Sequence, residues 1–171
     1  MQRRSIEAIV QVLDAAKVRY LITGELAVVA YGHLRFTADM DLVLDPESGA
    51  LERAVRALSA LGYRPRAPVA FADFADPEKR AGWIHEKGLT VFSVFSSEHP
   101  ATEIDLFVEA PFDFEAAYAR AERFDVTPGL RASFVCLADL IEMKRKTGRA
   151  QDLQDAEALE ALQRREGTNR E

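Results

Sequence analysis

The chain has 171 residues, of which 48% are apolar, and its 28 acidic and 22 basic residues give a formal net charge of −6. This length fits a single domain, expected over 1–166 with a frayed tail at 167–171, and the acidic balance argues against a protein that coats nucleic acid. The single cysteine excludes an intrachain disulfide and a cysteine-cluster zinc site. No apolar run reaches the ~20 residues that cross a bilayer, so we expect a soluble, cytoplasmic protein without a membrane partner.

Hydrophobic periodicity predicts both helices and strands along the chain. Helical spacing of apolar residues predicts helices over 6–13, 26–30, 47–61, 77–87, 112–122, 137–147 and 150–165. Short apolar or alternating runs predict strands over 18–23, 40–44, 89–95 and 102–108, the last two as antiparallel neighbours, and a hairpin over 124–135. The remainder of 63–88 is expected to be irregular. This order predicts an α+β (mixed α/β) domain, with a mixed sheet flanked by helices and two helices at the C-terminus.

Two of the predicted strands carry carboxylates at alternate positions. Alternate side chains of a strand share a face, so Asp39 and Asp41 point the same way, as do Glu103 and Asp105. We expect the two strands to be adjacent in the sheet, so that Asp39, Asp41 and Asp105 converge on a cup that would hold Mg²⁺ or Mn²⁺ for catalysis. The alternative is that each acidic strand is merely half exposed to solvent.

The segment before the first acidic strand has the pattern of a phosphate-binding turn. The strand over 18–23 runs into Gly24 and then a helix, and glycine lets the backbone approach a ligand closely. Between this turn and Asp39 lie Arg35 and Thr37, which could supply charge and a hydroxyl to a bound nucleotide. A strand, a glycine turn, a helix and then Asp-x-Asp together indicate a nucleotide site more strongly than either motif alone.

These motifs resemble the nucleotidyltransferase-fold superfamily related to DNA polymerase β. The matching stretches are LITGELAV over 21–28 and YGHLRFTADMD over 31–41, with the third acidic position of that pattern at Asp105. The spacing is similar to the small bacterial branch that includes AbiEii/AbiGii-type toxin nucleotidyltransferases. It is less similar to the minimal antitoxin branch, in which the turn continues into an Arg-Gly pair that this chain lacks. The resemblance implies a nucleotidyltransferase-like sheet, a nucleoside triphosphate as substrate, and a Mg²⁺ or Mn²⁺ cofactor held by Asp39, Asp41 and Asp105.

The last two predicted helices bring charged residues onto apolar faces. Lys144 shares a face with Leu140 and Ile141, so it must reach solvent or find an anion, and Asp152 lies beside leucines on the final helix. The order of Lys144, Thr147, Arg149, Asp152 and Asp155 is similar to a C-terminal motif of the toxin branch. The resemblance implies that Lys144, Arg149 and Asp152 contact the nucleotide and that Lys144 acts in catalysis. The alternative is a purely structural Lys144–Asp152 ion pair.

One position departs from the superfamily pattern. Glu25 stands where the second Gly or Ser of the turn is expected, and a carboxylate there would face the triphosphate. An acidic residue in a first helical turn is also stabilised by the helix dipole. Its side chain either rotates away and leaves its backbone N–H for the nucleotide, or it weakens or abolishes nucleotide binding.

Three functions follow as hypotheses. The first is a Mg-dependent enzyme that moves a nucleoside monophosphate from an NTP to an acceptor hydroxyl, and the resemblance implies an enzyme of the toxin type. The acceptor hydroxyl would belong to RNA (notably tRNA ends), to a protein or to a small molecule. Asp105 would help to activate that hydroxyl, while Lys144 and the Gly24 turn would stabilise the phosphates. The second is a non-catalytic binding module of a two-gene system, with a cognate antitoxin-like protein as partner. The third, a metal-dependent nuclease, is disfavoured because no suitable base lies near the Asp-x-Asp pair.

Overall fold

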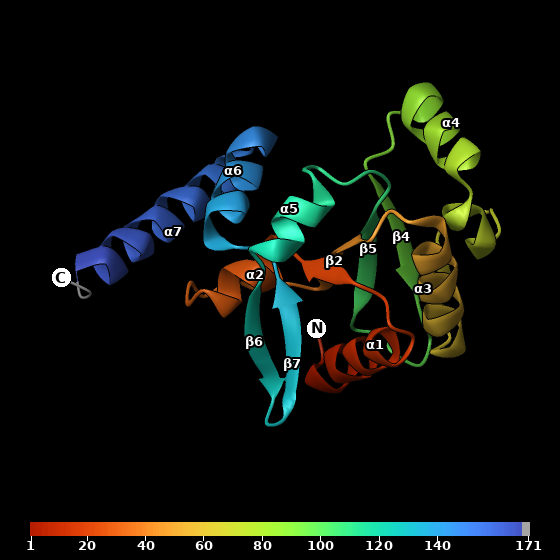
Figure 1. Cartoon of the computed structure of the whole chain (residues 1–171), viewed down its shortest axis with the longest axis horizontal. Helices are drawn as coiled ribbons and strands as arrows, with labels where there is room; N and C mark the ends of the chain where they lie inside the picture. Colours follow the sequence, from red (N-terminus) through yellow and green to blue (C-terminus); the bar gives the residue numbers. More distant parts are fainter. Residues whose placement is uncertain (169–171) are drawn as a thin grey trace.

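The computed structural model describes residues 1–168, with side chains described for 1–164. The strands are β1 (Tyr20–Ile22), β2 (Asp39–Leu44), β3 (Arg64–Pro65), β4 (Val91–Phe95), β5 (Glu103–Phe107), β6 (Glu122–Thr127) and β7 (Leu130–Phe134). The helices are α1 (Arg3–Ala15), α2 (Gly24–Ala30), α3 (Ser48–Ala60), the 3₁₀ helix η1 (Phe71–Ala75), α4 (Pro77–Lys87), α5 (Phe114–Ala119), α6 (Leu137–Thr147) and α7 (Ala150–Thr168). The predicted mixed α+β architecture is confirmed, as Figure 1 shows.

Within the described residues, the strands form one mixed sheet in the order β3-β4-β5-β2-β1-β7-β6. The predicted antiparallel pairing of β4 with β5 is confirmed, and so is the hairpin that β6 and β7 form. β2 pairs with β1 in antiparallel fashion and with β5 in parallel fashion. A parallel pair needs a long crossover connection, which here runs through α3, η1, α4 and β4. The strand with the Asp-x-Asp pair therefore lies beside the strand with Asp105, as predicted.

The alternation of side chains divides the sheet into an apolar face and a charged face. Met40, Leu42, Ile104 and Leu106 are fully buried, and they belong to one core cluster with residues of α1 and α3 such as Ile9 and Leu58. The intervening residues of β2 and β5 point to the opposite face, which therefore receives the carboxylates. The alternation along β2 and β5 therefore keeps the carboxylates of these two strands out of the apolar core.

The charged face is covered only in part. α5 packs over its far end, where Leu21 and Val43 join Phe114 and Ala117 in a second apolar cluster. At the N-terminal ends of β2 and β5 the carboxylates are half-buried or exposed, and α2 lies against β2. The chain thus leaves an accessible region of the sheet bounded by α2.

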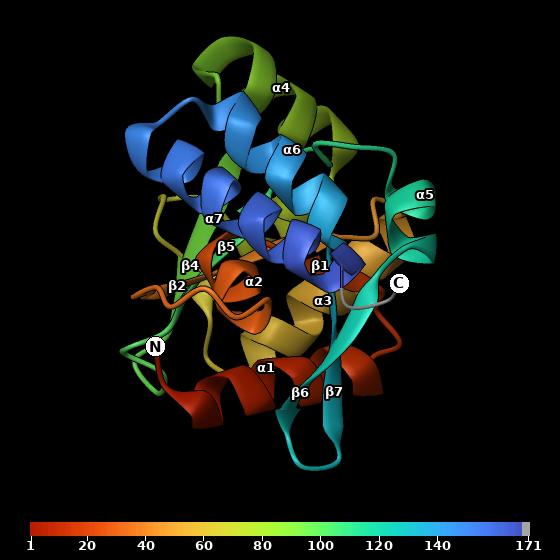
Figure 2. The ribbon, with the colours of Figure 1, turned by 90° about the vertical axis from the view of Figure 1, so that its left-hand side faces the viewer.

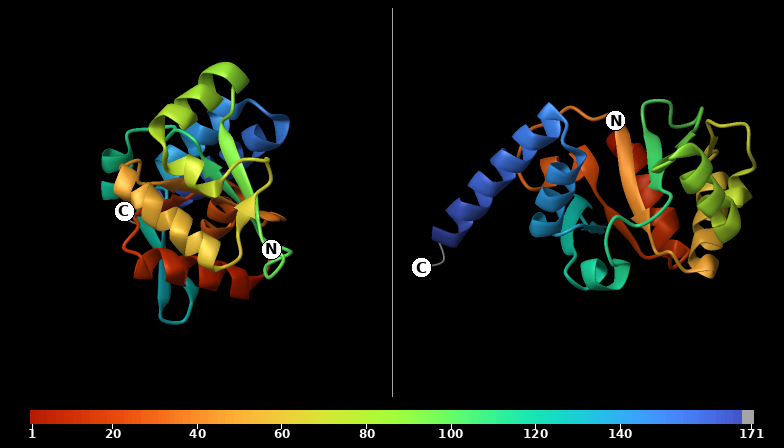
Figure 3. Two further views of the ribbon diagram at one scale, coloured as in Figure 1. Left: turned by 90° about the vertical axis from the view of Figure 1, so that its right-hand side faces the viewer. Right: turned by 90° about the horizontal axis from the view of Figure 1, so that it is seen from above.

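The two C-terminal helices, α6 and α7, pack beside α2. α6 contacts α2 and packs along α7, while α7 continues outward beyond the edge of the sheet (Figures 1 and 3). Figure 2 shows both helices lying over α2 on the same side of the sheet. Gly148 has a φ of +67°, the left-handed conformation that ends α6 and lets the chain reverse into α7. In the part of the chain that the structure describes, no helix has the length and apolar character needed to cross a membrane.

Several element boundaries differ from the predictions. α2 begins at Gly24, two residues earlier than expected, because the extended N-cap Thr23 ends the strand directly at the glycine. α5 is shorter than expected, and the carboxylate of its N-cap Asp113 accepts a hydrogen bond from the backbone N–H of Ala116 at 2.8 Å. Segment 63–88, expected to be irregular around one helix, also holds β3 and η1. α7 is helical to Thr168, and residues 169–171 of the predicted frayed tail lie outside the described residues.

Candidate active site

The glycine turn and the Asp-x-Asp strand are in direct contact. The backbone N–H of Thr23 donates to the carbonyl of Asp41 at 3.0 Å, which fixes the end of β1 beside β2. Gly24 has a φ of +61°, and a Cβ placed on it would lie 1.9 Å from Oδ2 of Asp41. Only glycine therefore lets the Asp41 carboxylate lie against this turn. A ligand held by Asp41 would also lie beside the first residues of α2.

The register of β2 and β5 brings the predicted carboxylates onto adjacent positions. Asp39 lies opposite Glu103 and Asp41 opposite Asp105, on strands that are ~4.8 Å apart. We call Asp39, Asp41 and Asp105 the carboxylate cup. The hydroxyl of Ser93 on β4 donates a hydrogen bond to Oδ1 of Asp105 and so orients this carboxylate. The sequence pattern alone did not single out Ser93, although the predicted β4–β5 pairing could have revealed it.

Negative charge in the cup is poorly compensated. Burial raises the pKa of Asp41 to about 7, with further contributions from the negative charges of Glu25 and Asp105. Burial also raises the pKa of Asp39, and the charges of Asp105 and Glu103 act in the same direction. A group of carboxylate oxygens in need of positive charge is the donor set that Mg²⁺ or Mn²⁺ prefers. The residues present therefore fit the predicted metal.

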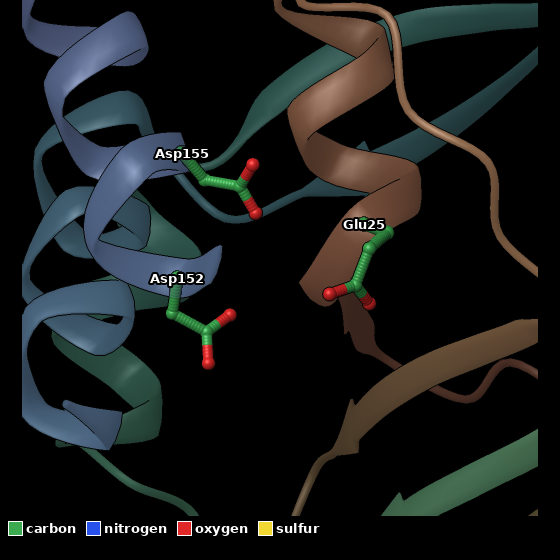
Figure 4. Close-up of side chains that lie close together, drawn as sticks. All are labelled: Glu25, Asp152 and Asp155. Carbon is green, nitrogen blue, oxygen red and sulfur yellow. The ribbon is translucent and has the colours of Figure 1, made fainter. Parts of the chain in front are cut away.

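A second charged cluster forms around Lys144. Its ammonium lies 3.0 Å from Oε1 of Glu25, 2.7 Å from Oδ1 of Asp152 and 3.1 Å from Oδ2 of Asp155. Figure 4 shows Glu25 on α2 facing Asp152 and Asp155 across the space between the helices. We call these four residues the Lys144 cluster. The predicted Lys144–Asp152 ion pair is thus present, as part of a larger network.

The Lys144 cluster has the geometry of a cation site that is already filled. One oxygen from each of its three carboxylates lies within 4.8 Å of the others, a spacing that could hold a metal ion. The buried ammonium of Lys144 contacts all three, so it supplies the positive charge that a metal would bring. Burial alone would lower the pKa of Lys144, but hydrogen bonds with Asp152 and Glu25 outweigh burial and raise it. The carboxylate cup therefore remains the better metal site.

The loop between α2 and β2 is attached to both clusters. Arg35, predicted to contact the nucleotide, has its Nε 3.2 Å from Oδ1 of the fully buried Asp155. The hydroxyl of Thr37 donates to the backbone carbonyl of Asp39 at 2.9 Å. This loop thus links the C-terminal helix α7 to the start of the acidic strand. The role of Asp155 as the partner of both Lys144 and Arg35 could not be read from the sequence.

Most of the predicted site residues therefore lie in or against two adjoining groups, and Arg149 belongs to neither. Gly24 contacts the carboxylate cup and its neighbour Glu25 belongs to the Lys144 cluster, so the first turn of α2 joins the two. Arg149 is exposed at the start of α7. Burial raises the pKa of Asp152, but hydrogen bonds from Lys144 and Thr147, aided by the charge of Arg149, lower it overall. The site thus combines a partly uncompensated acidic cup with an adjoining cluster in which three carboxylates compensate the charge of Lys144.

Comparison with known proteins supports the fold. No protein-family model and no curated protein matches the chain. Among solved structures, the chain is similar to the solution structure of the antibiotic-resistance factor ANT(2'')-Ia, with a TM-score of 0.56 and 18% sequence identity. The match covers 98% of this chain and 92% of that one. At this identity the likeness concerns the fold alone, and the chain has a nucleotidyltransferase-like fold.

Proposed function

We propose that this chain is a metal-dependent nucleotidyltransferase that moves a nucleoside monophosphate from an NTP to an acceptor hydroxyl. The observation that carries this proposal is the contact of the Gly24 turn with Asp41, on a strand paired in register with the one that bears Asp105. A glycine turn beside carboxylates on neighbouring strands suits a triphosphate held next to divalent cations. The nucleotidyltransferase-like fold supports the same reaction class.

In the proposed mechanism, Asp39, Asp41 and Asp105 would hold Mg²⁺ or Mn²⁺. When bound, the metal supplies positive charge that polarises the phosphates and lowers the pKa of the acceptor hydroxyl. The acceptor oxygen forms a bond to the α-phosphorus, and the bond from this phosphorus to the pyrophosphate oxygen breaks. Asp105, oriented by Ser93, takes the proton of the acceptor hydroxyl, and pyrophosphate leaves.

Several residues are proposed to hold the nucleotide on the side of α2 and α6. Glu25 points to Lys144 at 3.0 Å, which leaves the backbone of the Gly24 turn free of its carboxylate. Lys144 would stabilise charge on the phosphates, with Arg149 and Asp152 placed around it by the C-terminal helices. Arg35 and Thr37 would act by fixing the loop before Asp39, according to their contacts with Asp155 and the Asp39 carbonyl.

The proposed reaction leaves three kinds of acceptor hydroxyl open. The resemblance to AbiEii-type toxins favours RNA such as a tRNA end, with an antitoxin-like protein as partner. The likeness to an antibiotic-resistance factor favours a small hydroxylated antibiotic. A protein acceptor is the third option. The non-catalytic binding module stays as a second candidate function because three carboxylates already neutralise Lys144, which would reduce its attraction for phosphate.

Thermal unfolding with ligand tests the proposed site. Mg²⁺ together with an NTP should raise the melting temperature, because a ligand at 100 times its Kd stabilises the folded state by about 2.7 kcal/mol. Asp41→Asn should remove most of this shift. Asp125→Asn, which changes an exposed acidic residue on the β6–β7 hairpin, is the matched control and should retain it. Equal shifts in wild type and Asp41→Asn would reject the carboxylate cup as the binding site.

A further inference from the structure

The charged face of the sheet extends beyond the carboxylate cup onto β4 and β3. Ser93 lies opposite Asp105, and Arg64 lies opposite Phe95 in the antiparallel β3–β4 pair. The backbone N–H of Arg66 donates to the carbonyl of Ser93 at 3.0 Å, which continues that pairing. Because side chains alternate, Arg64, Arg66 and Phe95 project from the same face as Asp105.

These three residues form one surface, which we call the Arg–Phe platform. The guanidinium carbons of Arg64 and Arg66 lie 4.8 Å and 5.1 Å from the centre of the Phe95 ring. Arg66 also forms an exposed ion pair with Glu103, the residue opposite Asp39. For Arg64, no carboxylate partner occurs among the described residues. The platform thus offers an aromatic ring and two guanidinium groups at the edge of the cup.

The electrostatic link between platform and cup is direct. The hydrogen bond to Glu103 raises the pKa of Arg66, and the charges of Asp39 and Asp105 raise it further. In return, the charge of Arg66 opposes the increase in the pKa of Asp39. Because Arg66 pairs with Glu103, the residue opposite Asp39, a ligand that contacts Arg66 would lie at the edge of the cup.

The strand order places the platform on the acceptor side of the proposed reaction. β1, α2 and Lys144 lie to one side of β2, whereas β5, β4 and β3 lie to the other. In phosphoryl transfer the attacking and leaving oxygens are roughly in line, on opposite sides of the phosphorus. If the pyrophosphate lies at the Gly24 turn, the acceptor must approach over β5 and β4. Three strand spacings, ~14 Å, separate β2 from β3, and the long arginine side chains reach part of the way back.

The chemistry of the platform selects the kind of acceptor. Guanidinium groups bind phosphate oxygens in bidentate fashion, and an aromatic ring with nearby arginines provides a stacking surface for a nucleobase. A polycationic acceptor would instead be repelled by Arg64, whose charge no carboxylate among the described residues compensates, whereas Arg66 is paired with Glu103. We propose that the Arg–Phe platform is an acceptor subsite that binds the terminal nucleotides of a single-stranded polynucleotide. This inference rests on the proposed function, because it takes the cup as the reaction centre.

A binding experiment without NTP tests the inference. The probe is a fluorescent single-stranded RNA oligonucleotide, and its anisotropy is measured in Mg²⁺ at several salt concentrations. The Arg64→Ala/Arg66→Ala variant should bind at least tenfold more weakly. The slope of log K against log salt concentration should also become shallower by about 1.4, because each lost phosphate contact to a single strand accounts for ~0.7. Phe95→Leu, which keeps an apolar side chain without a ring, should bind about fivefold more weakly because stacking is lost.

Control variants separate the platform from general charge effects. Arg123→Ala/Arg131→Ala removes two exposed arginines from the β6–β7 hairpin and should leave oligonucleotide binding unchanged. Arg64→Lys/Arg66→Lys should keep the wild-type salt slope but bind more weakly, because lysine lacks the planar guanidinium. Melting curves check that each variant is folded. Stabilisation by Mg²⁺ and NTP should persist in the platform variants, because their changes lie on the acceptor side.

Four results would overturn the platform assignment. The first is equal binding by wild type and Arg64→Ala/Arg66→Ala, and the second is an equal loss of binding in the hairpin control. The third is competition by a mononucleotide as effective as that by the oligonucleotide. The fourth is a small polycation such as spermine that binds wild type and platform variant equally while the oligonucleotide does not bind. Failure of the proposed function gives a different result. In that case wild type would show no stabilisation by Mg²⁺ and NTP, whatever the oligonucleotide does.

Discussion

At the scale of single residues, the contact between the Gly24 backbone and the Asp41 carboxylate is the tightest constraint on the carboxylate cup. Gly24→Ala would place a Cβ 1.9 Å from Oδ2 of Asp41, in a backbone conformation that costs a non-glycine residue about 1–2 kcal/mol. The carboxylate would have to move. We expect a lower melting temperature and the loss of stabilisation by Mg²⁺ and NTP, both measured by thermal unfolding.

Gly88→Ala is the matched control for this substitution. Gly88 has a φ of +60°, almost the value of Gly24, but a Cβ there would have no atom within 4 Å. It should therefore report backbone strain alone and leave ligand stabilisation intact. Equal effects of Gly24→Ala and Gly88→Ala on ligand stabilisation would mean that the Gly24–Asp41 contact does not position the cup.

The raised pKa of Asp41 predicts an unusual pH dependence of stability. The ordinary value is 3.8 and the folded value is about 7, so between these values the folded state binds a proton that the unfolded chain has lost. The free energy of unfolding of the metal-free protein should therefore fall as pH rises through this window, by an amount on the order of 3 kcal/mol. Urea denaturation in a chelator at several pH values measures this slope.

Asp41→Asn isolates the contribution of this carboxyl group. The other titratable groups remain in the variant, so the difference between the two pH profiles reports Asp41. We expect Asp41→Asn to gain stability relative to wild type as pH rises towards about 8. Parallel profiles would show that the Asp41 carboxyl is not appreciably protonated in the folded protein at intermediate pH.

At the scale of secondary-structure elements, Lys144 connects three helices. From α6 it reaches Glu25 on α2 and both Asp152 and Asp155 on α7. Removing one partner of a buried charge network leaves the others uncompensated, at a cost of about 3–5 kcal/mol. We therefore expect Lys144→Met to lower the free energy of unfolding by about 3 kcal/mol, although methionine preserves much of the side-chain volume. Chemical denaturation measures this loss.

Lys146→Met provides the control on the same helix. The Lys146 side chain is 65% exposed and pairs with Glu142, so its removal should change the stability by less than about 1 kcal/mol. If Lys144→Met were as stable as Lys146→Met, the network around Lys144 would not hold α2, α6 and α7 together.

At the scale of the whole molecule, much of the carboxylate cup could be predicted and much of its surroundings could not. The period of two along 39–44 is enough to place Asp39 and Asp41 on one face of their strand, and the same period along 103–107 sets Asp105 apart from its apolar neighbours. The prediction that these two strands are neighbours is confirmed by the parallel pairing of β2 with β5. Such local patterns predict the face of a side chain well, because they depend only on neighbouring residues of one strand.

The remaining contacts depend on elements distant in sequence. Arg66 follows β3, a two-residue strand in a segment without clear hydrophobic periodicity, and it reaches the edge of the cup through Glu103. Glu25 meets Lys144 across 119 positions of sequence, so its orientation could not be predicted from the turn alone. The acidic residue at position 25, where the superfamily pattern has Gly or Ser, is thus explained by its partner Lys144, which the packing of α6 against α2 brings close.

Nucleotidyl transfer by this chain is tested most directly by following the label of an NTP in the presence of Mg²⁺ and total RNA or lysate. An NTP labelled at the α-phosphate should transfer its label to an acceptor, whereas one labelled at the γ-phosphate should release it as pyrophosphate. Asp41→Asn should abolish the transfer. The absence of transfer from the α-labelled NTP to any component, by a wild-type protein that Mg²⁺ and NTP stabilise, would contradict the account and favour a non-catalytic binding module.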